Sequence, residues 1–244
     1  MKKIEFIGIP GSGKSTLTKR LCELNDSFLS LSDFDLHYRS PISKFKKITS
    51  ENLIRKLNRL IIKRELIPTF SKLNAENPDK LLKLQNFLAE MDSNDRYFTS
   101  QVLMNDYFKL AVMHQFTDLS SERYIVCDEH YAHRSGRIFK HLSKNDKPKI
   151  LDEYFEVVGY PDVVIKTDLN PDIALKRMSS RKIGVPSAYK SKTEEEIKQT
   201  LRKSDEYSNF LYEYLLQKGI QGYRYNTANN ISNEKLKIEN DLST

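Results

Sequence analysis

Short apolar runs, each bounded by turn-forming residues, recur along the chain and predict five β-strands. Between these runs, apolar residues follow a helical period; Leu17 and Leu21, for example, fall on one face of a helix expected over residues 15–22. Strands that alternate with helices are typical of a parallel sheet covered on both faces, with a ligand site at the carboxyl ends of the strands. The predicted strands cover residues 3–7, 28–31, 124–127, 163–166 and 223–225.

The long connection between the second and third predicted strands has helical patterning. A cap at Ser50 begins one predicted helix, Asn77 begins a second, and apolar residues recur at helical spacing over 95–116. We interpret most of these apolar positions as core, and we expect a helical insertion over residues 40–118 within a single domain of residues 1–244. By analogy between folds, such an insertion often borders the second substrate of an enzyme.

Composition narrows the class of protein without selecting a function. Of the 244 residues, 39% are hydrophobic, which is enough for a core and excludes a disordered chain. No apolar run approaches the roughly 18 residues of a membrane helix, and none is typical of a signal peptide, so we expect a cytoplasmic protein with no membrane partner. Cys22 and Cys127 lie in apolar segments and are expected to be buried thiols rather than a disulfide.

The net charge of +7 allows two interpretations. It reflects either an ordinary lysine-rich surface or an electric field that attracts nucleotides, phosphorylated molecules or nucleic acid. A nucleic-acid partner would also require a dense basic stripe with interleaved aromatic residues, which the sequence lacks. Charge alone therefore selects no partner, and a homodimer is compatible with the sequence.

Residues 8–15 match the phosphate-binding pattern G-x-x-x-x-G-K-[ST] in full, between a predicted strand and a predicted helix. The glycines let backbone N–H groups approach phosphate oxygens, Lys14 can reach the β- and γ-phosphates, and the Ser15 hydroxyl can bind Mg²⁺. The helix N-terminus adds its dipole to the anion site. The residues expected to contact the nucleotide are Gly8, Pro10, Gly11, Ser12, Gly13, Lys14, Ser15 and Thr16.

Asp128 and Glu129 directly follow the third predicted strand. In phosphate-loop proteins, an acid at the end of a neighbouring strand binds Mg²⁺ or takes the proton of the acceptor hydroxyl. We assign Asp128 to the metal and Glu129 to the proton, and the reverse assignment also fits. The alternative is a solvated acidic turn; with the phosphate loop present, we favour a functional role.

Asp33 and Asp35 follow the second predicted strand. Residues two apart in an extended chain point to the same side, so both carboxylates would emerge at the edge of the sheet that carries Lys14. One would orient or deprotonate an acceptor hydroxyl, and the other would help to place Mg²⁺. A helix cap formed by either aspartate explains them equally well.

After the fourth strand, Pro171 predicts the start of a helix on which Arg177 and Arg181, four residues apart, would share a face. A segment with Gly and Pro then breaks the helix. We interpret residues 178–195 as a lid that delivers these arginines to a transferring phosphoryl group, whose charge they would offset. For each arginine singly, a salt bridge on a surface helix is the alternative.

Other signals are weaker. One of Arg134 and Arg137, which follow the Asp128–Glu129 pair, would hold an anionic part of the acceptor. His130 and His133 lack a partner pattern for metal binding or nucleophilic catalysis, so we interpret them as structural. Asn226 begins a polar segment after the last strand that would contact adenine through its backbone and help to bind the cofactor.

Residues 6–16, the strand into Asp128, residues 161–181 and the helix around Glu206 resemble the nucleoside and nucleotide kinase group of phosphate-loop proteins, with thymidylate kinases the nearest match. The resemblance covers both ends of the chain and the third strand, but little of residues 40–115. It implies a three-layer α/β/α fold of the P-loop NTPase type, with five parallel strands in the order 2-3-1-4-5. It also implies ATP, Mg²⁺ and phosphoryl transfer.

The acceptor is less defined by this resemblance. Glu129-His130-Tyr131 stands where thymidylate kinases have Asp-Arg-Tyr and deoxynucleoside kinases have Glu-Arg-Ser, so the arginine that usually contacts the acceptor is missing. The Asp33/Asp35 pair is similar to that of shikimate and gluconate kinases, whose acceptors are small hydroxylated molecules.

The sequence therefore predicts an ATP-dependent kinase acting on a small-molecule phosphoryl acceptor. A nucleoside or nucleoside monophosphate comes first, then a non-nucleotide alcohol such as a sugar, metabolite or antibiotic, and then a polynucleotide end. A P-loop NTPase switch or regulator is the alternative from another class, and a nucleotide-binding structural protein is a third.

Overall fold

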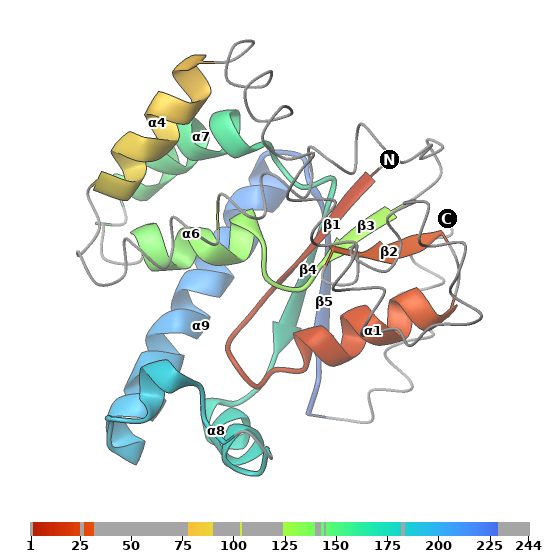
Figure 1. The fold of residues 1–244 in the computed structure, drawn as a ribbon, viewed down its shortest axis with the longest axis vertical. Coiled ribbons are helices and arrows are strands. Elements are labelled where there is room, and N and C mark those ends of the chain that lie inside the picture. The colour runs from red at the N-terminus through yellow and green to blue at the C-terminus, as the bar shows by residue number, and fades with distance from the viewer. Residues whose placement is uncertain are drawn as a thin grey trace, which may run out of the picture.

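A five-stranded parallel sheet forms the centre of the molecule (Figure 1). The computed structural model describes residues 2–24, 27–31, 78–89, 103, 124–139, 143, 145–181 and 184–228. The strands lie in the order β2-β3-β1-β4-β5 and every neighbouring pair is parallel, which confirms the expected sheet. They are β1 (Lys2–Ile7), β2 (Phe28–Ser30), β3 (Tyr124–Cys127), β4 (Val163–Asp168) and β5 (Gln221–Asn226).

Helices cover both faces of this sheet (Figure 1). Alternate residues of a strand point to opposite faces. Ile4 and Phe6 of β1 therefore pack with Leu17 and Leu21 of α1, whereas Ile7 belongs to the cluster formed with α6, α7 and α9. The helices are α1 (Lys14–Leu24), α4 (Pro78–Ala89), α6 (Tyr131–Phe139), α7 (Lys147–Val158), α8 (Pro171–Ser179) and α9 (Glu194–Gln217), with a 3-10 turn η3 (Ser187–Tyr189) before α9.

Specific caps begin the two helices that flank the predicted lid. The Asn170 side chain accepts a hydrogen bond of 2.8 Å from the backbone of α8, and Pro171 occupies the first turn, as the sequence predicted. Thr193 and Glu196 form a reciprocal capping box at the start of α9. The Asn170 cap fixes where α8 begins, and the Thr193 capping box fixes where α9 begins and so where the segment between the two helices ends.

The predicted strand boundaries differ from the observed ones by at most two residues. The helix predicted from Asn77 corresponds to α4, and Leu103, which is helical and fully buried, falls within the helix predicted over 95–116. Several predictions lie outside the described residues: the helix from Ser50, the rest of the helix over 95–116, most of the insertion over 40–118, and the polar tail over 229–239.

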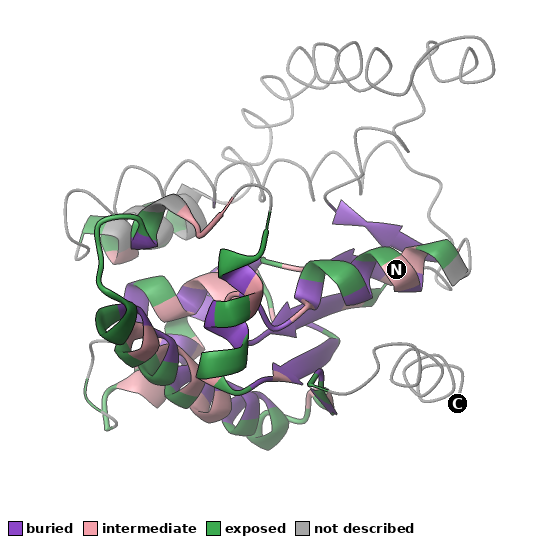
Figure 2. Cartoon of the chain, turned by 90° about the horizontal axis from the view of Figure 1, so that it is seen from below, coloured by how far each residue is buried: buried purple, intermediate pink, exposed green. Residues whose placement is uncertain are grey.

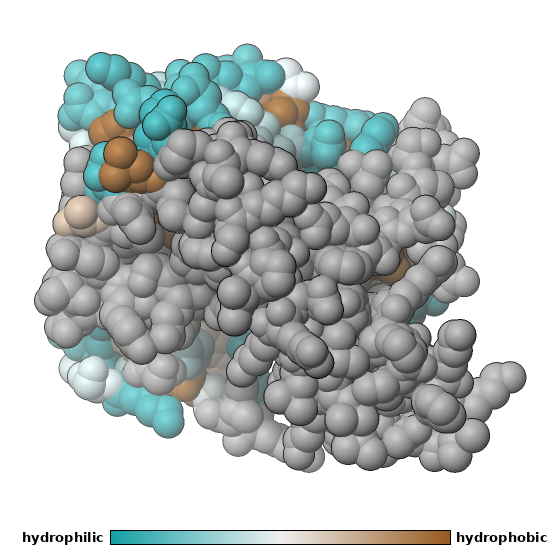
Figure 3. Space-filling model, turned by 45° about the horizontal axis from the view of Figure 1, so that its top comes forward, coloured by the Kyte–Doolittle hydropathy of each residue, from teal (hydrophilic) through white to brown (hydrophobic). Residues whose placement is uncertain are grey.

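Burial follows the layers: β1 to β4 are mainly buried, the edge strand β5 is largely exposed or half-buried, and the outer sides of the helices are exposed (Figure 2). On the face shown in Figure 3, the described surface is mainly hydrophilic, with small hydrophobic areas. Among the described residues, the exposed large hydrophobic side chains are Leu82, Ile173 and Leu216, on three different helices. Within the described ranges, no helix has the length and apolar character to cross a membrane. The two cysteines form no disulfide: Cys127 is buried and Cys22 half-buried.

Candidate functional site

The phosphate loop lies between β1 and α1, and its glycines adopt conformations that other residues rarely tolerate. Gly8, Gly11 and Gly13 have φ angles of 140°, 86° and 89°. A Cβ atom at Gly8 would lie 2.4 Å from Thr167 Oγ1, and one at Gly11 would lie 2.7 Å from the Ala174 carbonyl oxygen. Only glycine therefore fits at these two positions, and the loop packs directly on β4 and α8.

Ser12 turns its side chain into the protein rather than toward a nucleotide. Its hydroxyl shares a buried hydrogen bond of 2.7 Å with that of Thr167, and its backbone N–H donates to the Ile9 carbonyl oxygen at 3.2 Å. Ser12 therefore fixes the shape of the loop, whereas its predicted contact with the nucleotide stays a prediction. The predicted contact residues that reach the surface are Pro10, Gly13, Ser15 and Thr16.

Lys14 is buried, and the loop itself holds its ammonium group. Nζ donates to the carbonyl oxygens of Gly8 at 2.8 Å and Ile9 at 3.0 Å. Burial lowers the pKa of Lys14 to about 8, against the opposing effect of the negative charges of Glu129 and Asp128. The ammonium group is therefore charged below that pH, and it lies within electrostatic reach of both carboxylates.

This pKa predicts how nucleotide binding depends on pH. A charged Lys14 attracts phosphate oxygens, and its neutralisation above pH 8 will weaken ATP binding by up to about tenfold per pH unit. Titration with a fluorescent ATP analogue between pH 7 and 10 measures the effect. Lys14→Arg, whose guanidinium group stays charged, serves as the control and will show a flat profile. A flat profile for the unaltered protein would contradict the low pKa.

Asp128 and Glu129 form the turn that follows β3. β3 pairs in parallel with β1, and Glu5 lies opposite Cys127 in the register, so this turn lies at the same edge of the sheet as the phosphate loop. Asp128 is half-buried and Glu129 is exposed. Since the charges of both raise the pKa of Lys14, the fold brings together residues that the sequence predicted from separate motifs.

α6 begins close after this turn and carries His133, Arg134 and Arg137. His133 Nε2 lies 3.9 Å from Glu129 Oε1, which is too long for a hydrogen bond. Burial lowers the pKa of His133 well below its ordinary value, and the charges of Lys14, Arg134 and Arg137 lower it further. The His133 ring is therefore neutral at neutral pH. The positive charge in this part of the site comes from Lys14 and the two arginines.

The prediction that Arg177 and Arg181 share a helix face is wrong. α8 ends at Ser179, and the backbone N–H of Ser180 bonds back to two carbonyl oxygens of the helix. Arg181 therefore lies beyond the helix end. Residues four apart share a face only within a continuous helix, and α8 does not continue as far as Arg181.

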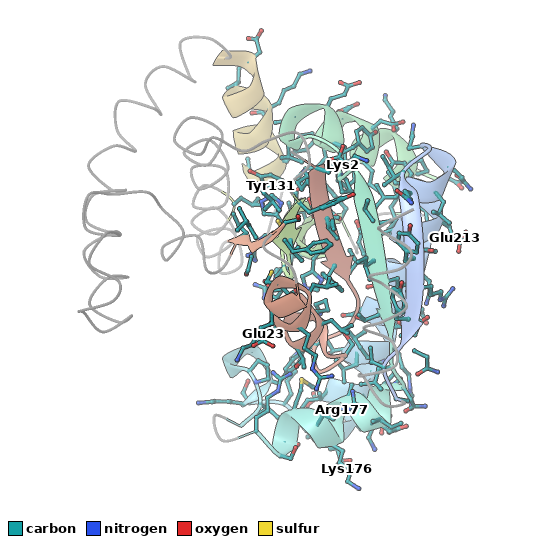
Figure 4. All side chains as sticks on the ribbon, turned by 90° about the vertical axis from the view of Figure 1, so that its right-hand side faces the viewer. Lys2, Glu23, Tyr131, Lys176, Arg177 and Glu213 are labelled. Carbon is teal, nitrogen blue, oxygen red and sulfur yellow. The ribbon has the colours of Figure 1, made fainter. Side chains whose placement is uncertain are left out.

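The two arginines consequently occupy different places. Arg177 Nη2 donates to the Thr227 carbonyl oxygen at 2.8 Å. Figure 4 shows Arg177 on the inner side of α8, whereas Lys176 points outward. Arg181 is exposed, and its positive charge lowers the pKa of Lys14. Of the two arginines, Arg181 is thus the one whose charge reaches the lysine of the phosphate loop.

The turn after β5 is held in place by its own hydrogen bonds. The buried Thr227 donates its backbone N–H to the Asp168 carbonyl oxygen at 2.9 Å. Asn226 Oδ1 accepts a hydrogen bond of 3.0 Å from the backbone N–H of Ala228. The Asn226 side chain therefore shapes a turn that Arg177 contacts, and its role in binding adenine stays a prediction.

Tyr189 lies in the segment that the sequence predicts as a lid, but the sequence did not mark it as a site residue. It lies in η3 and packs in a cluster with Ile9 of the phosphate loop and Met178 of α8. Burial raises the pKa of Tyr189, with the charge of Arg137 opposing this effect and that of Glu129 reinforcing it. The segment around Tyr189 therefore lies beside the loop and the acidic turn. The sequence signal that could have identified Tyr189 was a single aromatic residue within a segment that contains Gly and Pro.

Asp33 and Asp35 lie outside the described residues, so their roles stay predictions. Ser15 and Asp128, the predicted metal ligands, follow β1 and β3 at one edge of the sheet. No three His, Cys, Asp or Glu side chains in the described part of the chain group together in a way that could hold a metal ion. The predicted site does not require such a group, because Mg²⁺ is often bound by one or two protein ligands together with substrate phosphates.

No protein-family model and no curated protein matches this sequence. Solved structures do match its fold. The chain is similar to deoxyadenosine kinase from M. mycoides with bound dCTP, with a TM-score of 0.51 and 13% identity over 99% of this chain and 98% of that one. The same kinase with bound dATP gives a TM-score of 0.45 at 13% identity, with both chains fully covered. The product complex with dCMP and dCDP gives 0.46 at 14% identity, covering 99% and 98%. At this identity the likeness concerns the fold.

Proposed function

We propose that this protein is an ATP-dependent kinase that transfers the γ-phosphoryl group to a hydroxyl or phosphate of a small molecule. The observation that carries the proposal is the parallel pairing of β1 with β3, which brings the Asp128–Glu129 turn to the edge of the sheet that holds Lys14, within electrostatic reach of both carboxylates and of Arg181. This arrangement offers a phosphate-binding lysine, a metal ligand, a proton acceptor and a charge-stabilising arginine. Phosphoryl transfer requires these parts and little covalent chemistry from the protein.

The donor nucleotide would bind with its β- and γ-phosphates in the phosphate loop. The glycine backbone at Gly8 and Gly11 and the N-terminus of α1 offer N–H groups to phosphate oxygens. Lys14 would exchange its hydrogen bonds to loop carbonyls for contacts with those oxygens. Arg177, which the Thr227 carbonyl orients, presents a planar guanidinium group on which adenine can stack.

The metal and the proton would be handled by residues that follow β1 and β3. Mg²⁺, when bound, neutralises phosphate oxygens, and the Ser15 hydroxyl and the Asp128 carboxylate would hold it. Glu129 would accept the proton of the acceptor hydroxyl. Asp33 and Asp35 are the alternative bases from the sequence.

Residues 178–195 would act as the lid, and the insertion over 40–118 would border the acceptor. The presence of Tyr189 and Ile9 in one hydrophobic cluster supports the first assignment, because that cluster joins the segment to the phosphate loop. Arg181 lies in the same segment, so movement of the lid would carry this charge to and from the site. Closure of such a segment excludes water, which otherwise competes with the acceptor.

A nucleoside or nucleoside monophosphate is the first acceptor class that we propose. The fold likeness to a deoxyadenosine kinase supports testing deoxynucleosides before other compounds. The test is transfer of label from γ-labelled ATP, with Mg²⁺, to deoxyadenosine, deoxycytidine, thymidine, their monophosphates, sugars, aminoglycosides and nucleic-acid ends. A labelled nucleoside product supports the proposal, and a labelled sugar or antibiotic favours the non-nucleotide alternative. Label found only in free phosphate would contradict a kinase and favour a hydrolysing switch.

A further inference from the structure

Glu5 is a carboxylate in the middle of the apolar strand β1, and its side chain is fully buried. A buried charge requires partners, and Glu5 has three. Its Oε1 atom lies 3.1 Å from His130 Nδ1 and 3.2 Å from Lys3 Nζ. Its Oε2 atom accepts a hydrogen bond of 2.7 Å from the backbone N–H of Ala132. Both carboxylate oxygens are therefore engaged.

These partners keep the carboxylate charged. Burial raises the pKa of Glu5, but the charges of Lys3 and His130 and the hydrogen bonds from His130 and Ala132 outweigh it and bring the pKa to about 2. Glu5 is therefore an anion at neutral pH. Since an ionised carboxylate only accepts hydrogen bonds, Nδ1 of His130 faces it as a donor.

The two residues after the acidic turn are directed back along β1. His130 is fully buried, and its ring centroid lies 3.9 Å from that of Tyr131. Lys3 Nζ lies 5.4 Å from the Tyr131 ring centroid. Figure 4 shows Tyr131 near the labelled Lys2 at the start of β1, whereas Arg177 lies at the opposite end of the sheet. Their side chains therefore anchor the turn to the strand and leave Asp128 and Glu129 on the side of the phosphate loop.

Through these contacts, one carboxylate joins the two halves of the proposed site. Glu5 lies in the strand that leads into the phosphate loop, and His130 immediately follows Glu129. The N–H of Ala132 belongs to the first turn of α6, where backbone N–H groups have no partner within the helix and a negative charge is favourable. Glu5 thus holds both the turn and the start of the helix that follows it.

We propose that Glu5 is a positioning residue, which through His130 and Ala132 sets the place of the Asp128–Glu129 turn relative to Lys14. The inference rests on the proposed function, which gives that turn its metal and proton roles. Stability alone does not require this arrangement, because replacing a buried ion pair with apolar residues of similar volume is often neutral or stabilising. Hydrogen bonds differ from apolar contacts in that they fix direction and distance.

The test compares Glu5→Gln with Asp152→Asn in the full-length protein. Glutamine keeps the shape of Glu5 and removes its charge. The control makes the same chemical change in another polar network, because Asp152 accepts hydrogen bonds from Tyr160 at 3.1 Å and Tyr214 at 2.6 Å. This network lies toward the amino ends of the strands, where α9 leads into β5, and so away from the acidic turn.

The first readout is the affinity for ATP with and without Mg²⁺, and the second is kcat for phosphoryl transfer. We expect the affinity of Glu5→Gln for metal-free ATP to stay within about twofold of that of the unaltered protein. The factor by which Mg²⁺ increases the affinity for ATP will be about tenfold smaller in the variant, and kcat will be about 10- to 100-fold lower. Asp128→Asn provides the reference for loss of the metal ligand. Retained Mg²⁺ enhancement in Glu5→Gln, or an equal loss in Asp152→Asn, would overturn the proposal.

Variants of His130 keep the inference testable if Glu5→Gln does not fold. His130→Ala removes the donor that faces Glu5, whereas His130→Asn places an amide N–H near the position of Nδ1. We expect the alanine variant to show the Mg²⁺ defect and the asparagine variant to recover most of it. Identical behaviour of the two variants would show that the hydrogen bond does not position the turn.

The two readouts separate this inference from the kinase proposal. Mg²⁺-dependent ATP binding needs no acceptor, so it tests Glu5 even if no compound in the acceptor panel is phosphorylated. A failed panel would therefore overturn the proposed kinase activity, whereas an unchanged Mg²⁺ enhancement in Glu5→Gln would overturn the positioning role.

Discussion

Replacing Lys14 with methionine will lower the rate of phosphoryl transfer by about 1,000-fold. Methionine has a similar length but no charge, so it removes the buried ammonium group that the loop holds 2.8 Å from the Gly8 carbonyl oxygen and 3.0 Å from that of Ile9. In a buried site, the loss of a charge that faces the transferring phosphate is costly because solvent cannot replace it. Initial rates with the acceptor that the panel identifies measure the effect, and circular dichroism checks the fold.

Lys19→Met is the matched control for this variant. Lys19 lies on the same helix, is exposed, and has only Glu23 as an ion-pair partner among the described residues, at 3.7 Å. An exposed pair of this kind contributes little, so the control will keep its rate within about twofold and its melting temperature nearly unchanged. If Lys14→Met turned over as fast as Lys19→Met, the phosphate loop would have no part in the reaction.

Replacing Arg181 with methionine will lower kcat by about 1,000-fold while the KM for ATP changes little, as expected for an arginine that acts on the transferring group. Arg177→Met will instead raise the KM for ATP by about tenfold with most of kcat retained, because the contact with adenine that we propose for Arg177 would act equally in the ground state and the transition state. The structure distinguishes the two arginines, because the charge of Arg181 lowers the pKa of Lys14, whereas Arg177 donates a hydrogen bond to the Thr227 carbonyl oxygen. Steady-state kinetics with varied ATP measures both.

Arg202→Met serves as the control for these two variants. Arg202 is exposed on α9, and its ion-pair partner among the described residues is Glu195, at 3.8 Å. It will therefore leave kcat and KM unchanged. Equal losses of kcat in Arg177→Met and Arg181→Met would contradict the division of roles and restore the interpretation that both arginines act on the phosphoryl group.

The phosphate loop and the sheet were predictable from the sequence because their determinants are local. Gly8 and Gly11 belong to a continuous motif, and the structure shows that their place against β4 and α8 leaves no room for a Cβ atom. The strands were recognised as apolar runs, and their observed ends agree within two residues. The strand order followed from the resemblance to phosphate-loop kinases rather than from the periodicity.

The positions of Arg177 and Arg181 were not predictable in the same way. Whether Arg177 and Arg181 share a face depends on where α8 ends, and Ser180 ends it between them. In the segment beyond, Tyr189 belongs to a hydrophobic cluster that also contains Ile9, on a loop far away in the sequence. A four-residue spacing carries no information about such a distant contact.

By itself, the sequence determined the phosphate loop, the alternating strands and helices, and the acids that follow the third strand, because each is encoded by neighbouring residues. Only the tertiary structure decided which charges meet. Glu5 was not among the residues that the sequence predicted for the site: its partner His130 lies 125 residues away, and only the parallel pairing of β1 with β3 brings the two together. Because Glu5 is buried away from water, its carboxylate must accept its hydrogen bonds from protein groups, and these bonds fix the orientation of the pair.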